Sequence, residues 1–472
     1  MISNALLYLT RKNLIETDAR IIEPYCQGWR GERGKALFLA RPRSMDELSE
    51  IVRTCIRNDI HLIPQSARTG LVGASVPDDS GQQGIVSLER LTSRFEFDRV
   101  NRSVTCSAGL RLSEVNARLK PDGLYLPIDL GADPCIGGMI ATNTGGARLI
   151  RHGDMRRHVL ELSVILGDAD GTMVKLGSPL RKNATGPDWK HLFVGTGATF
   201  GIIGECTLSV ERLPVHRAAA LVPLPDETIL PDFLIRLEEQ FGSLISAIEF
   251  MSANAMHAAY AHVPSLKRPF GHDIPEMAVL VELSCDWPLA AEDRSLDDIL
   301  LSGLCALWDE TSGKLGAGVF GRAEEIWGIR HTLSEGVRRR GRLYAFDLAF
   351  RRSDTLRFRS VMTARLNRQF PGIEVCDFGH VGDGGLHFNL VDHLPADEWT
   401  PDRERAIRDF VIRAAVEEFG GSFSAEHSIG PVNQHYLNTF ADDFHKSLAS
   451  ALEPVTSGRS FGRVHYSGIN QR

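Results

Sequence analysis

The stretch "HVGDGGLHFN", residues 380–389, holds two histidines on either side of a glycine-rich turn. The pattern predicts a hairpin with residues 382–385 as its turn, in which His380 faces His387. Directly opposite residues place their Cβ atoms about 4.5–5.5 Å apart on one face. Both imidazoles can then converge on one ion at the usual Zn–N distance of about 2.0–2.1 Å. Asn389, two residues beyond His387, projects from the same face.

A metal site needs a further ligand, and the stretch "SAEHSIG", residues 424–430, offers one. Glu426 is a hard anionic ligand, and His427 is a base beside it. Two histidines and a carboxylate with open coordination positions are typical of a catalytic divalent site rather than a structural one. Paired histidines and an isolated Glu-His also occur without a metal, so the spacing alone leaves both interpretations open.

Three stretches rich in glycine and small residues lie between apolar strands, at residues 66–73, 126–154 and 192–210. Glycine lets the backbone approach something large and flat, or phosphorylated. The signatures GxGxxG and GxxxxGK[ST] do not occur in the sequence, which argues against Rossmann and P-loop sites. Three such loops favour a buried dinucleotide, and plain turns between strands are the alternative.

The elements that must position these residues are helices and strands in alternation. Residues 44–47, "SMDE", have the spacing of a capping box before an amphipathic helix. Thr400-Pro401 predicts another helix, which stops at Gly420. A proline-rich stretch after residue 213 indicates a domain boundary. A chain of 472 residues is expected to form two to three domains.

The charge, the apolar stretches and the cysteines of the sequence exclude several classes of protein. The formal charge of −7, which the one short basic cluster at residues 338–342 does not offset, argues against a nucleic-acid partner or an anionic membrane surface. No apolar stretch is long enough for a signal peptide or a transmembrane segment. Eight cysteines are scattered without a CxxC pair, as expected of reduced thiols in a cytoplasmic protein.

These motifs resemble those of a known family, the flavin-dependent D-2-hydroxyacid dehydrogenases of the vanillyl-alcohol oxidase/p-cresol methylhydroxylase (PCMH) type. The family includes D-2-hydroxyglutarate dehydrogenase, D-lactate dehydrogenase and the glycolate oxidase FAD subunit. The resemblance runs over nearly the whole chain and follows the family's order. It rests on "RTGLVGASVP", "LPIDLGADPCIGGMIATNTGGARLIRHGD", "GTGATFGII", "HVGDGGLHFN" and "SAEHSIG".

The resemblance implies an α+β fold with a two-subdomain PCMH-type FAD-binding domain over residues 36–213. Residues 1–35 are expected to pack on that domain. A substrate-binding cap domain is expected over residues 214–472, with a C-terminal segment that contributes to the FAD and metal site. The implied cofactors are FAD and a divalent metal, for which Zn²⁺ is suited because it has no redox chemistry of its own.

The family's site positions can be carried onto this chain residue by residue. The metal ligands match His380, His387 and Glu426, and the catalytic base matches His427. The substrate-binding positions match Arg330, Ser334 and Asn389. The flavin positions match Ser66, Ala67, Arg68, Thr69, Gly70, Leu71, Val72 and Gly73 in the first loop, Pro127, Gly137, Gly138, Thr142, Asn143, Gly145 and Gly146 in the second, and Gly201, Ile202 and Ile203 in the third.

The sequence departs from the family at several of these motifs. The substrate lysine of the family falls on Ala345 in "LYAFDLAF", and Ser428 replaces a glycine in "EHSIG". The missing lysine suggests a substrate unlike the family's usual dicarboxylate. Its far end is either less charged or held by an arginine from residues 338–340.

The resemblance implies oxidation of a D-2-hydroxy acid to the 2-oxo acid, with hydride transfer to flavin N5 and His427 as base. The electron acceptor is then an electron-transfer flavoprotein, a quinone or a cytochrome, and a homodimer is a candidate assembly. One alternative is a zinc hydrolase without flavin, in which the three glycine-rich loops have no role. Another is a degenerate flavoprotein that binds ligands without turnover, which the departures from the family at Ala198, Ala345 and Ser428 leave open.

Overall fold

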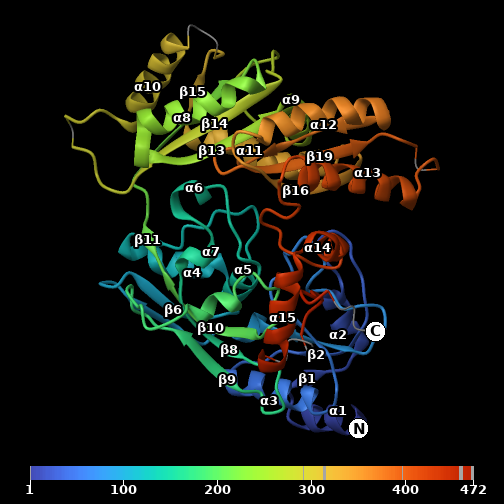
Figure 1. Cartoon of the computed structure of the whole chain (residues 1–472). Coiled ribbons are helices and arrows are strands. Elements are labelled where there is room, and N and C mark those ends of the chain that lie inside the picture. The colour runs from blue at the N-terminus through green and yellow to red at the C-terminus, as the bar shows by residue number, and fades with distance from the viewer. Residues whose placement is uncertain (1, 291, 312–314, 396, 457–460, 469–472) are drawn as a thin grey trace. The chain divides into compact units, whose positions relative to one another are not determined.

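The computed structural model describes residues 2–290, 292–311, 315–395, 397–456 and 461–468, and it divides into two compact units (Figure 1). The first unit comprises Met1–Gly146, Gly153–Leu213 and Glu426–Arg472. The second comprises Ala147–His152 and Pro214–Ala425. Both units combine helices with sheets, which confirms the α+β prediction.

The first unit begins with a four-stranded sheet in the order β1-β2-β4-β3, in which β4 pairs parallel with β2 and β3. Helices α1 and α3 share a core with this sheet that includes Leu9, Phe38 and Leu48. The elements are α1 (Ile2–Arg11), β1 (Ile15–Glu16), β2 (Ala36–Ala40), α3 (Met45–Ile56), β3 (Leu62–Gln65) and β4 (Gln83–Ser87).

Helix α3 is the helix that the capping-box spacing predicts. The Ser44 hydroxyl accepts a hydrogen bond from the Glu47 N–H at 3.2 Å. The Glu47 carboxylate accepts from the Arg43 N–H at 2.7 Å, one residue before the expected partner. Both bonds satisfy N–H groups near the start of the helix, where no intrahelical partner exists. The buried stripe is Leu48, Ile51, Val52 and Cys55.

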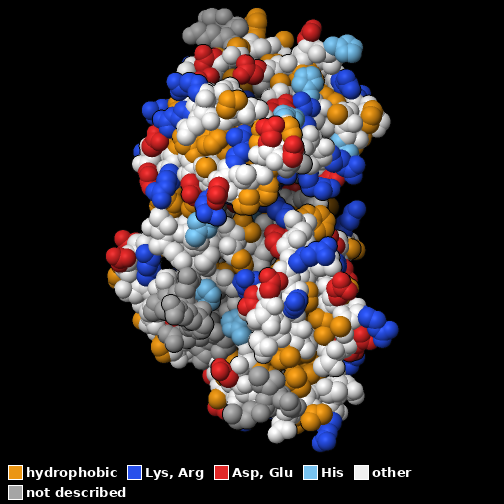
Figure 2. Space-filling view, turned by 90° about the vertical axis from the view of Figure 1, so that its right-hand side faces the viewer, with side chains coloured by type: hydrophobic (Ala, Val, Ile, Leu, Met, Phe, Trp, Pro, Cys, Tyr) orange, Lys and Arg blue, Asp and Glu red, His pale blue; other side chains and the backbone are white. Residues whose placement is uncertain are grey.

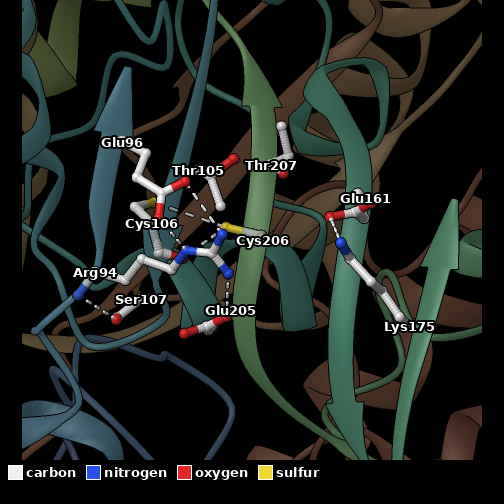
Figure 3. A network of polar contacts seen from close by, with 10 residues as sticks. All are labelled: Arg94, Glu96, Thr105, Cys106, Ser107, Glu161, Lys175, Glu205, Cys206 and Thr207. Carbon is white, nitrogen blue, oxygen red and sulfur yellow. Dashed lines mark hydrogen bonds and ion pairs between the residues drawn. The ribbon is translucent and has the colours of Figure 1, made fainter. Parts of the chain in front are cut away.

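A five-stranded antiparallel sheet forms the second part of this unit, in the order β5-β6-β10-β8-β9. Opposed residues of β6 and β10 are matched in kind (Figure 3): Thr105 bonds Thr207 at 2.9 Å, and the Cys106 and Cys206 sulfurs lie 3.8 Å apart. Such directly opposed side chains stabilise strand pairing. The strands are β5 (Phe95–Asp98), β6 (Ser103–Ser107), β8 (Val159–Ile165), β9 (Met173–Gly177) and β10 (Ile202–Ser209).

The C-terminal part of the chain belongs to the first unit. It contains α14 (Gln434–Phe440) and α15 (Asp443–Thr456). The carbonyl of Thr456 accepts a hydrogen bond from the Gly167 N–H at 3.2 Å, just beyond β8. Phe461 is buried beside β3 in the core of the four-stranded sheet. Phe461 therefore belongs to the same apolar core as Leu9 of α1.

The second unit is built on an antiparallel sheet in the order β15-β12-β14-β13-β18-β19-β16, with β17 paired to β19. Strands β13 and β14 are buried along their whole lengths, because helices cover the sheet. The strands are β12 (His216–Pro223), β13 (Ile245–Ser252), β14 (Met277–Cys285), β15 (Val319–Gly321), β16 (Arg342–Ala349), β17 (Ile373–Val375), β18 (Phe378–Gly379) and β19 (Gly385–Asp392).

Helices cover this sheet on both faces (Figure 1). Helices α9 (Ala253–His262) and α11 (Ala323–Arg338) share an apolar cluster with Met251 and Phe378. On the opposite face, Phe358 of α12 (Thr355–Gln369) lies edge-on to Phe388, with ring centroids 5.5 Å apart. Because side chains alternate along a strand, His387 faces away from Phe388.

The helix expected from Thr400-Pro401 is α13 (Pro401–Arg413). The Thr400 hydroxyl accepts from the Arg403 N–H at 3.2 Å. A π-helical turn over Ala414–Glu418 follows, and Gly420 has a φ of +60°. The predicted stop at Gly420 is confirmed, since a left-handed glycine is the usual end of a helix.

The arginines at 338–340 lie at an exposed end of α11. Arg338 and Arg339 both pair with Glu335 at 2.7 Å, and Arg340 pairs with Glu374 at 2.7 Å. The face shown in Figure 2 likewise has cationic and anionic side chains interspersed. No helix within the described residues is long and apolar enough to cross a membrane.

Candidate active site

The hairpin that carries His380 and His387 has a different register from the predicted one. Phe378, not His380, is paired with His387. The carbonyl of His380 accepts from the Gly384 and Gly385 N–H groups at 3.0 Å, so the turn covers residues 381–384. Gly384 has a φ of +94°, and a Cβ there would lie 2.1 Å from the Phe350 carbonyl oxygen. Contact with a distant segment therefore fixes the position of the turn.

The register error leaves the geometry of the histidine pair usable, because a shift of two residues keeps each side chain on its face. The Nε2 atoms of His380 and His387 lie 3.2 Å apart, and the ring planes are inclined by 81°. Two ligands of a tetrahedral zinc ion at about 2.0–2.1 Å are about 3.3–3.4 Å from each other. The observed separation fits two ligands of one ion.

A carboxylate lies behind each histidine, at the ring nitrogen that faces away from the pair. Glu249 of β13 is fully buried, and its Oε1 lies 2.6 Å from Nδ1 of His380. Asp347 of β16 is the register partner of His387, and its Oδ1 lies 3.7 Å from Nδ1 of that ring. If both Nδ1 atoms carry the proton, the two Nε2 lone pairs face each other, and a shared cation relieves their repulsion.

Glu249 is ionised in spite of its burial. Burial by itself raises the pKa of this carboxyl, but the His380 ring, when it is protonated, and the Arg330 guanidinium outweigh burial through charge and hydrogen bonds and leave the pKa lowered. A buried carboxylate held in its charged form is a strong acceptor for both neighbours. Glu249 was not among the predicted site residues, although an acid within the apolar strand "SAIEFMS" is a visible signal.

Arg330 of α11 shares this carboxylate. Its Nε donates to Oε2 of Glu249 at 2.6 Å, and the guanidinium lies 4.8 Å from the ring centroid of Phe378. The residue is 8% exposed. Among the described residues, neither terminal nitrogen of Arg330 has a hydrogen-bond partner. This open edge is the arrangement that receives a carboxylate through two parallel bonds.

The other two predicted substrate residues, Ser334 and Asn389, differ in their exposure. Ser334 is exposed on α11, one turn beyond Arg330. Asn389 is buried on β19, and its amide donates to the His387 carbonyl at 3.3 Å. The register partner of Asn389 is Ala345. The next pair on the same face, Leu343 and Val391, belongs to the apolar core. Among the described residues on this face of β16 and β19, no lysine or arginine replaces the absent lysine.

The segment before Glu426 runs beside β16. Ser422 forms a bridge with Ala349, and the Ala425 N–H donates to the Asp347 carbonyl at 3.2 Å. Glu426 is the next residue in the chain and begins the last part of the first unit. Both Glu426 and His427 are partly buried, with His427 Nε2 3.8 Å from Glu426 Oε1.

In the first unit, the first two predicted flavin loops meet at the short helix α5 (Ile136–Thr142). A Cβ on Gly138 would lie 2.8 Å from the Ser66 hydroxyl, and one on Gly137 would lie 2.6 Å from the Cβ of Ala108. Only glycine allows this close approach. The first loop follows β3 and comprises Ser66, Ala67, Arg68, Thr69, Gly70, Leu71, Val72 and Gly73.

Two of the predicted flavin residues have side chains that already bind the protein. Arg68 has a φ of +60° and donates from Nη1 to the Pro24 carbonyl at 2.9 Å. Asn143 caps the end of α5 with a φ of +50°, and its amide donates to Asp154 at 2.6 Å. In the same stretch, Pro127, Gly145 and Gly146 are buried, while Thr142 is partly buried.

The third loop binds the other end of α5. The Gly195 and Gly197 N–H groups donate to the carbonyls of Ile140 and Ala141 at 3.0 and 2.8 Å. Gly201 follows, and β10 then begins at Ile202 and Ile203, which are buried. The three loops that the sequence analysis singled out are therefore gathered around one short helix.

Ser428, which stands where the family has glycine, has a φ of +67°. A left-handed conformation costs a residue with a side chain roughly 1–2 kcal/mol relative to glycine. We expect Ser428→Gly to raise the thermal midpoint by about 2 °C, as measured by calorimetry. Gly430→Ala should lower the thermal midpoint, because the added Cβ would lie 2.3 Å from the Val72 carbonyl oxygen. A lower midpoint for Ser428→Gly would show that the serine is not strained.

Comparison with known proteins places the chain in a family. The FAD binding domain matches residues 36–177, and the FAD linked oxidases, C-terminal domain, matches residues 213–454. The chain is 30% identical to D-2-hydroxyglutarate dehydrogenase of Xanthomonas citri pv. viticola over 90% of this chain and 87% of that protein. It is 32% identical to the probable mitochondrial D-2-hydroxyglutarate dehydrogenase of Oryza sativa subsp. japonica, over 85% and 70% of the two chains.

Solved structures agree on the fold. Substrate-bound p-cresol methylhydroxylase matches with a TM-score of 0.73 at 13% identity, over 99% of this chain and 97% of the other. Alkyldihydroxyacetonephosphate synthase matches with a TM-score of 0.68 at 14% identity, over 97% and 83%. The chain belongs to the family of FAD-linked oxidases. It is an FAD-dependent oxidoreductase with the PCMH-type fold, as the resemblance implied.

Proposed function

We propose that this protein oxidises a D-2-hydroxy acid to the 2-oxo acid by a flavin-dependent, metal-assisted reaction with His427 as base. The observation that carries the proposal is the pair of Nε2 atoms of His380 and His387, 3.2 Å apart. The open guanidinium edge of Arg330 lies next to the same buried carboxylate. A cation site beside a carboxylate anchor suits a substrate with adjacent hydroxyl and carboxylate oxygens.

The described residues fit both cofactors. For FAD, the absence of side chains at Gly137 and Gly138 lets α5 pack closely against Ala108 and against Ser66 of the first loop. For a divalent ion, two imidazoles converge, and each has a carboxylate at its other nitrogen. When bound, FAD supplies the hydride acceptor at N5, and a divalent ion such as Zn²⁺ supplies Lewis acidity to the hydroxyl oxygen.

The chain's own residues then have separate tasks. Arg330 binds the carboxylate of the substrate and fixes its orientation. His427 takes the proton of the hydroxyl, which a neutral imidazole can do near neutral pH. Asn389 is proposed to bind a substrate oxygen, and Ser334 a further one. These roles follow the family's pattern at matching positions.

Glu426 is proposed as the third protein ligand. Ala425 is hydrogen bonded to Asp347, the register partner of His387, and Glu426 follows Ala425 directly. Glu426 is therefore attached to a segment that is hydrogen bonded to β16, the strand next to the one that carries His387. A carboxylate with two imidazoles leaves coordination positions open for substrate oxygens.

The substrate is proposed to have an uncharged far end. Relatives are named D-2-hydroxyglutarate dehydrogenase, but Ala345 stands at the family's lysine in this chain. The sequence analysis left open whether an arginine at 338–340 replaces that charge. All three guanidinium groups pair with Glu335 or Glu374 at an exposed helix end. This pairing supports the less charged substrate.

Anaerobic reduction of the bound flavin tests the proposal. The purified protein is expected to be yellow and to bleach with D-2-hydroxy acids, but not with their L enantiomers. Among D-lactate, D-malate, D-2-hydroxyglutarate and longer or aromatic acids, those with uncharged far ends should react fastest. A colourless protein would favour the zinc hydrolase, and a yellow protein that no hydroxy acid bleaches would favour the degenerate flavoprotein.

We propose that residues 36–213 bind FAD and residues 214–472 bind substrate, with residues 1–35 packed on the FAD domain; the shared core of Leu9 and Leu48 supports this. The acceptor is proposed to be an electron-transfer flavoprotein, a quinone or a cytochrome, and the assembly a homodimer. A cytoplasmic location is supported by the eight cysteines, all of which are free thiols.

A further inference from the structure

We propose that Glu249 is a positioning residue that sets the metal-ligating nitrogen of His380 and the substrate-binding edge of Arg330 at the same time. This inference rests on the proposed function, because it assigns a task to a residue behind the metal and substrate groups. Glu249 contacts His380 and Arg330 through its two carboxylate oxygens. It acts through the two side chains that it holds.

The geometry of the contact is a bridge through both carboxylate oxygens. Oε1 of Glu249 lies 2.6 Å from Nδ1 of His380, and Oε2 accepts from Nε of Arg330 at 2.6 Å. Glu249 is 0% exposed and sits on β13, a strand buried along its whole length. A carboxylate in such a place has little freedom, so it transmits a fixed orientation to both partners.

For His380, the bridge determines which nitrogen is available. An ionised carboxylate accepts a hydrogen bond, so Nδ1 carries the proton and Nε2 keeps its lone pair. A histidine ligand held in this way is oriented before the ion binds and is a better electron donor. Asp347 stands in the same relation to His387, but at 3.7 Å the contact is longer. Glu249 therefore makes the shorter of the two contacts.

For Arg330, the bridge determines which edge is available. Nε donates to Glu249, and neither terminal nitrogen has a hydrogen-bond partner among the described residues. The ring of Phe378 lies 4.8 Å from the guanidinium carbon and limits rotation about the remaining bonds. Loss of the carboxylate leaves Arg330 with the same charge but without a fixed direction. Binding of the substrate carboxylate is then weakened.

The chain contains a matched control for this residue. Glu282 on the neighbouring strand β14 is also 0% exposed and is also held by an arginine, with Arg148 Nε and Nη2 at 2.8 and 2.7 Å. Its Oε2 accepts from Trp327 Nε1 at 2.6 Å, one turn before Arg330 on α11. No histidine is bonded to it among the described residues. Glu282 thus reproduces the buried ion pair without the link to the histidine.

The test compares zinc affinity in Glu249→Gln and Glu282→Gln, each as the FAD-containing full chain stripped by a chelator and titrated with Zn²⁺. We expect Glu249→Gln to bind zinc 10–100-fold more weakly than wild type, while Glu282→Gln keeps its affinity. KM for the hydroxy acid should rise in Glu249→Gln as well. Glu249→Asp, which retains the charge on a shorter side chain, should recover part of the zinc affinity.

The outcomes separate this inference from the function on which it rests. Wild-type protein that binds no zinc contradicts the proposed function, and this inference with it. Wild-type protein that binds zinc, together with unchanged affinity and KM in Glu249→Gln, contradicts the inference alone. Equal losses in Glu249→Gln and Glu282→Gln also overturn it, because they indicate general damage to the fold. If Glu249→Gln does not fold, unchanged zinc affinity in Glu249→Asp without a change in KM overturns it in the same way.

Discussion

The substitution His427→Gln is expected to slow flavin reduction by the hydroxy acid by a factor of about 10²–10⁴. The hydroxyl proton must leave as the hydride departs, and glutamine cannot accept it. Zinc and FAD contents should stay at wild-type levels, because His427 is assigned to neither cofactor. The dissociation constant of the substrate should change little, since Arg330, the proposed anchor of its carboxylate, is unchanged.

Stopped-flow absorbance of the flavin under anaerobic conditions measures this effect directly. His393→Gln is a suitable control, because this histidine is exposed at the end of β19 and bonds Glu374 at 2.8 Å. It should reduce flavin at the wild-type rate. If His427→Gln also keeps that rate, the base is another residue, and the match to the family's motif is misleading at this position.

The substitution His387→Ala is expected to remove zinc from the protein and to lower the rate of flavin reduction at least about a hundredfold. One of the three proposed protein ligands is lost, and the remaining pair is expected to hold the ion too weakly. FAD should remain bound, because the predicted flavin loops belong to the first unit and His387 to the second.

Metal analysis of the purified protein and the same stopped-flow assay check this expectation. His393→Ala is the matched control and should keep both zinc and activity. Chelator-treated wild type should behave like His387→Ala, and added Zn²⁺ should restore only the wild type. A variant that lacks zinc but reduces flavin at the normal rate would remove the metal from the mechanism.

The hairpin shows how far the sequence predicts the site. The alternation of side chains along strands was enough to place His380 and His387 on one face. The register was wrong by two residues, because the turn is determined by the approach of Gly384 to Phe350. That contact joins segments more than thirty residues apart, and local spacing carries no information about it.

Glu249 was not predicted for a related reason. It lies about 130 residues before His380, and the two meet only because β13 pairs with β18 in the assembled sheet. The sequence of its strand is that of an apolar core strand with one acidic residue, Glu249. Such an acid must be paired, but the sequence does not name the partner. Strand order is a property of the whole fold.

The serine at position 428, where the family has glycine, can be explained only from the structure. As a sequence difference, it left open a degenerate flavoprotein. In the fold, Ser428 adopts the left-handed conformation that glycine would adopt, and Asn433 donates to its carbonyl at 3.1 Å. The turn before Gly430 is therefore kept in this chain at some cost in stability.

The central proposal is that a divalent ion takes part in oxidation of the hydroxy acid. The most direct test is a titration of chelator-stripped, FAD-containing protein with Zn²⁺, in which the anaerobic rate of flavin reduction by a D-2-hydroxy acid is followed. We expect almost no reduction without the ion and a rate that rises to its limit at one equivalent. A full rate in the stripped protein, unchanged on addition of Zn²⁺, would contradict the account.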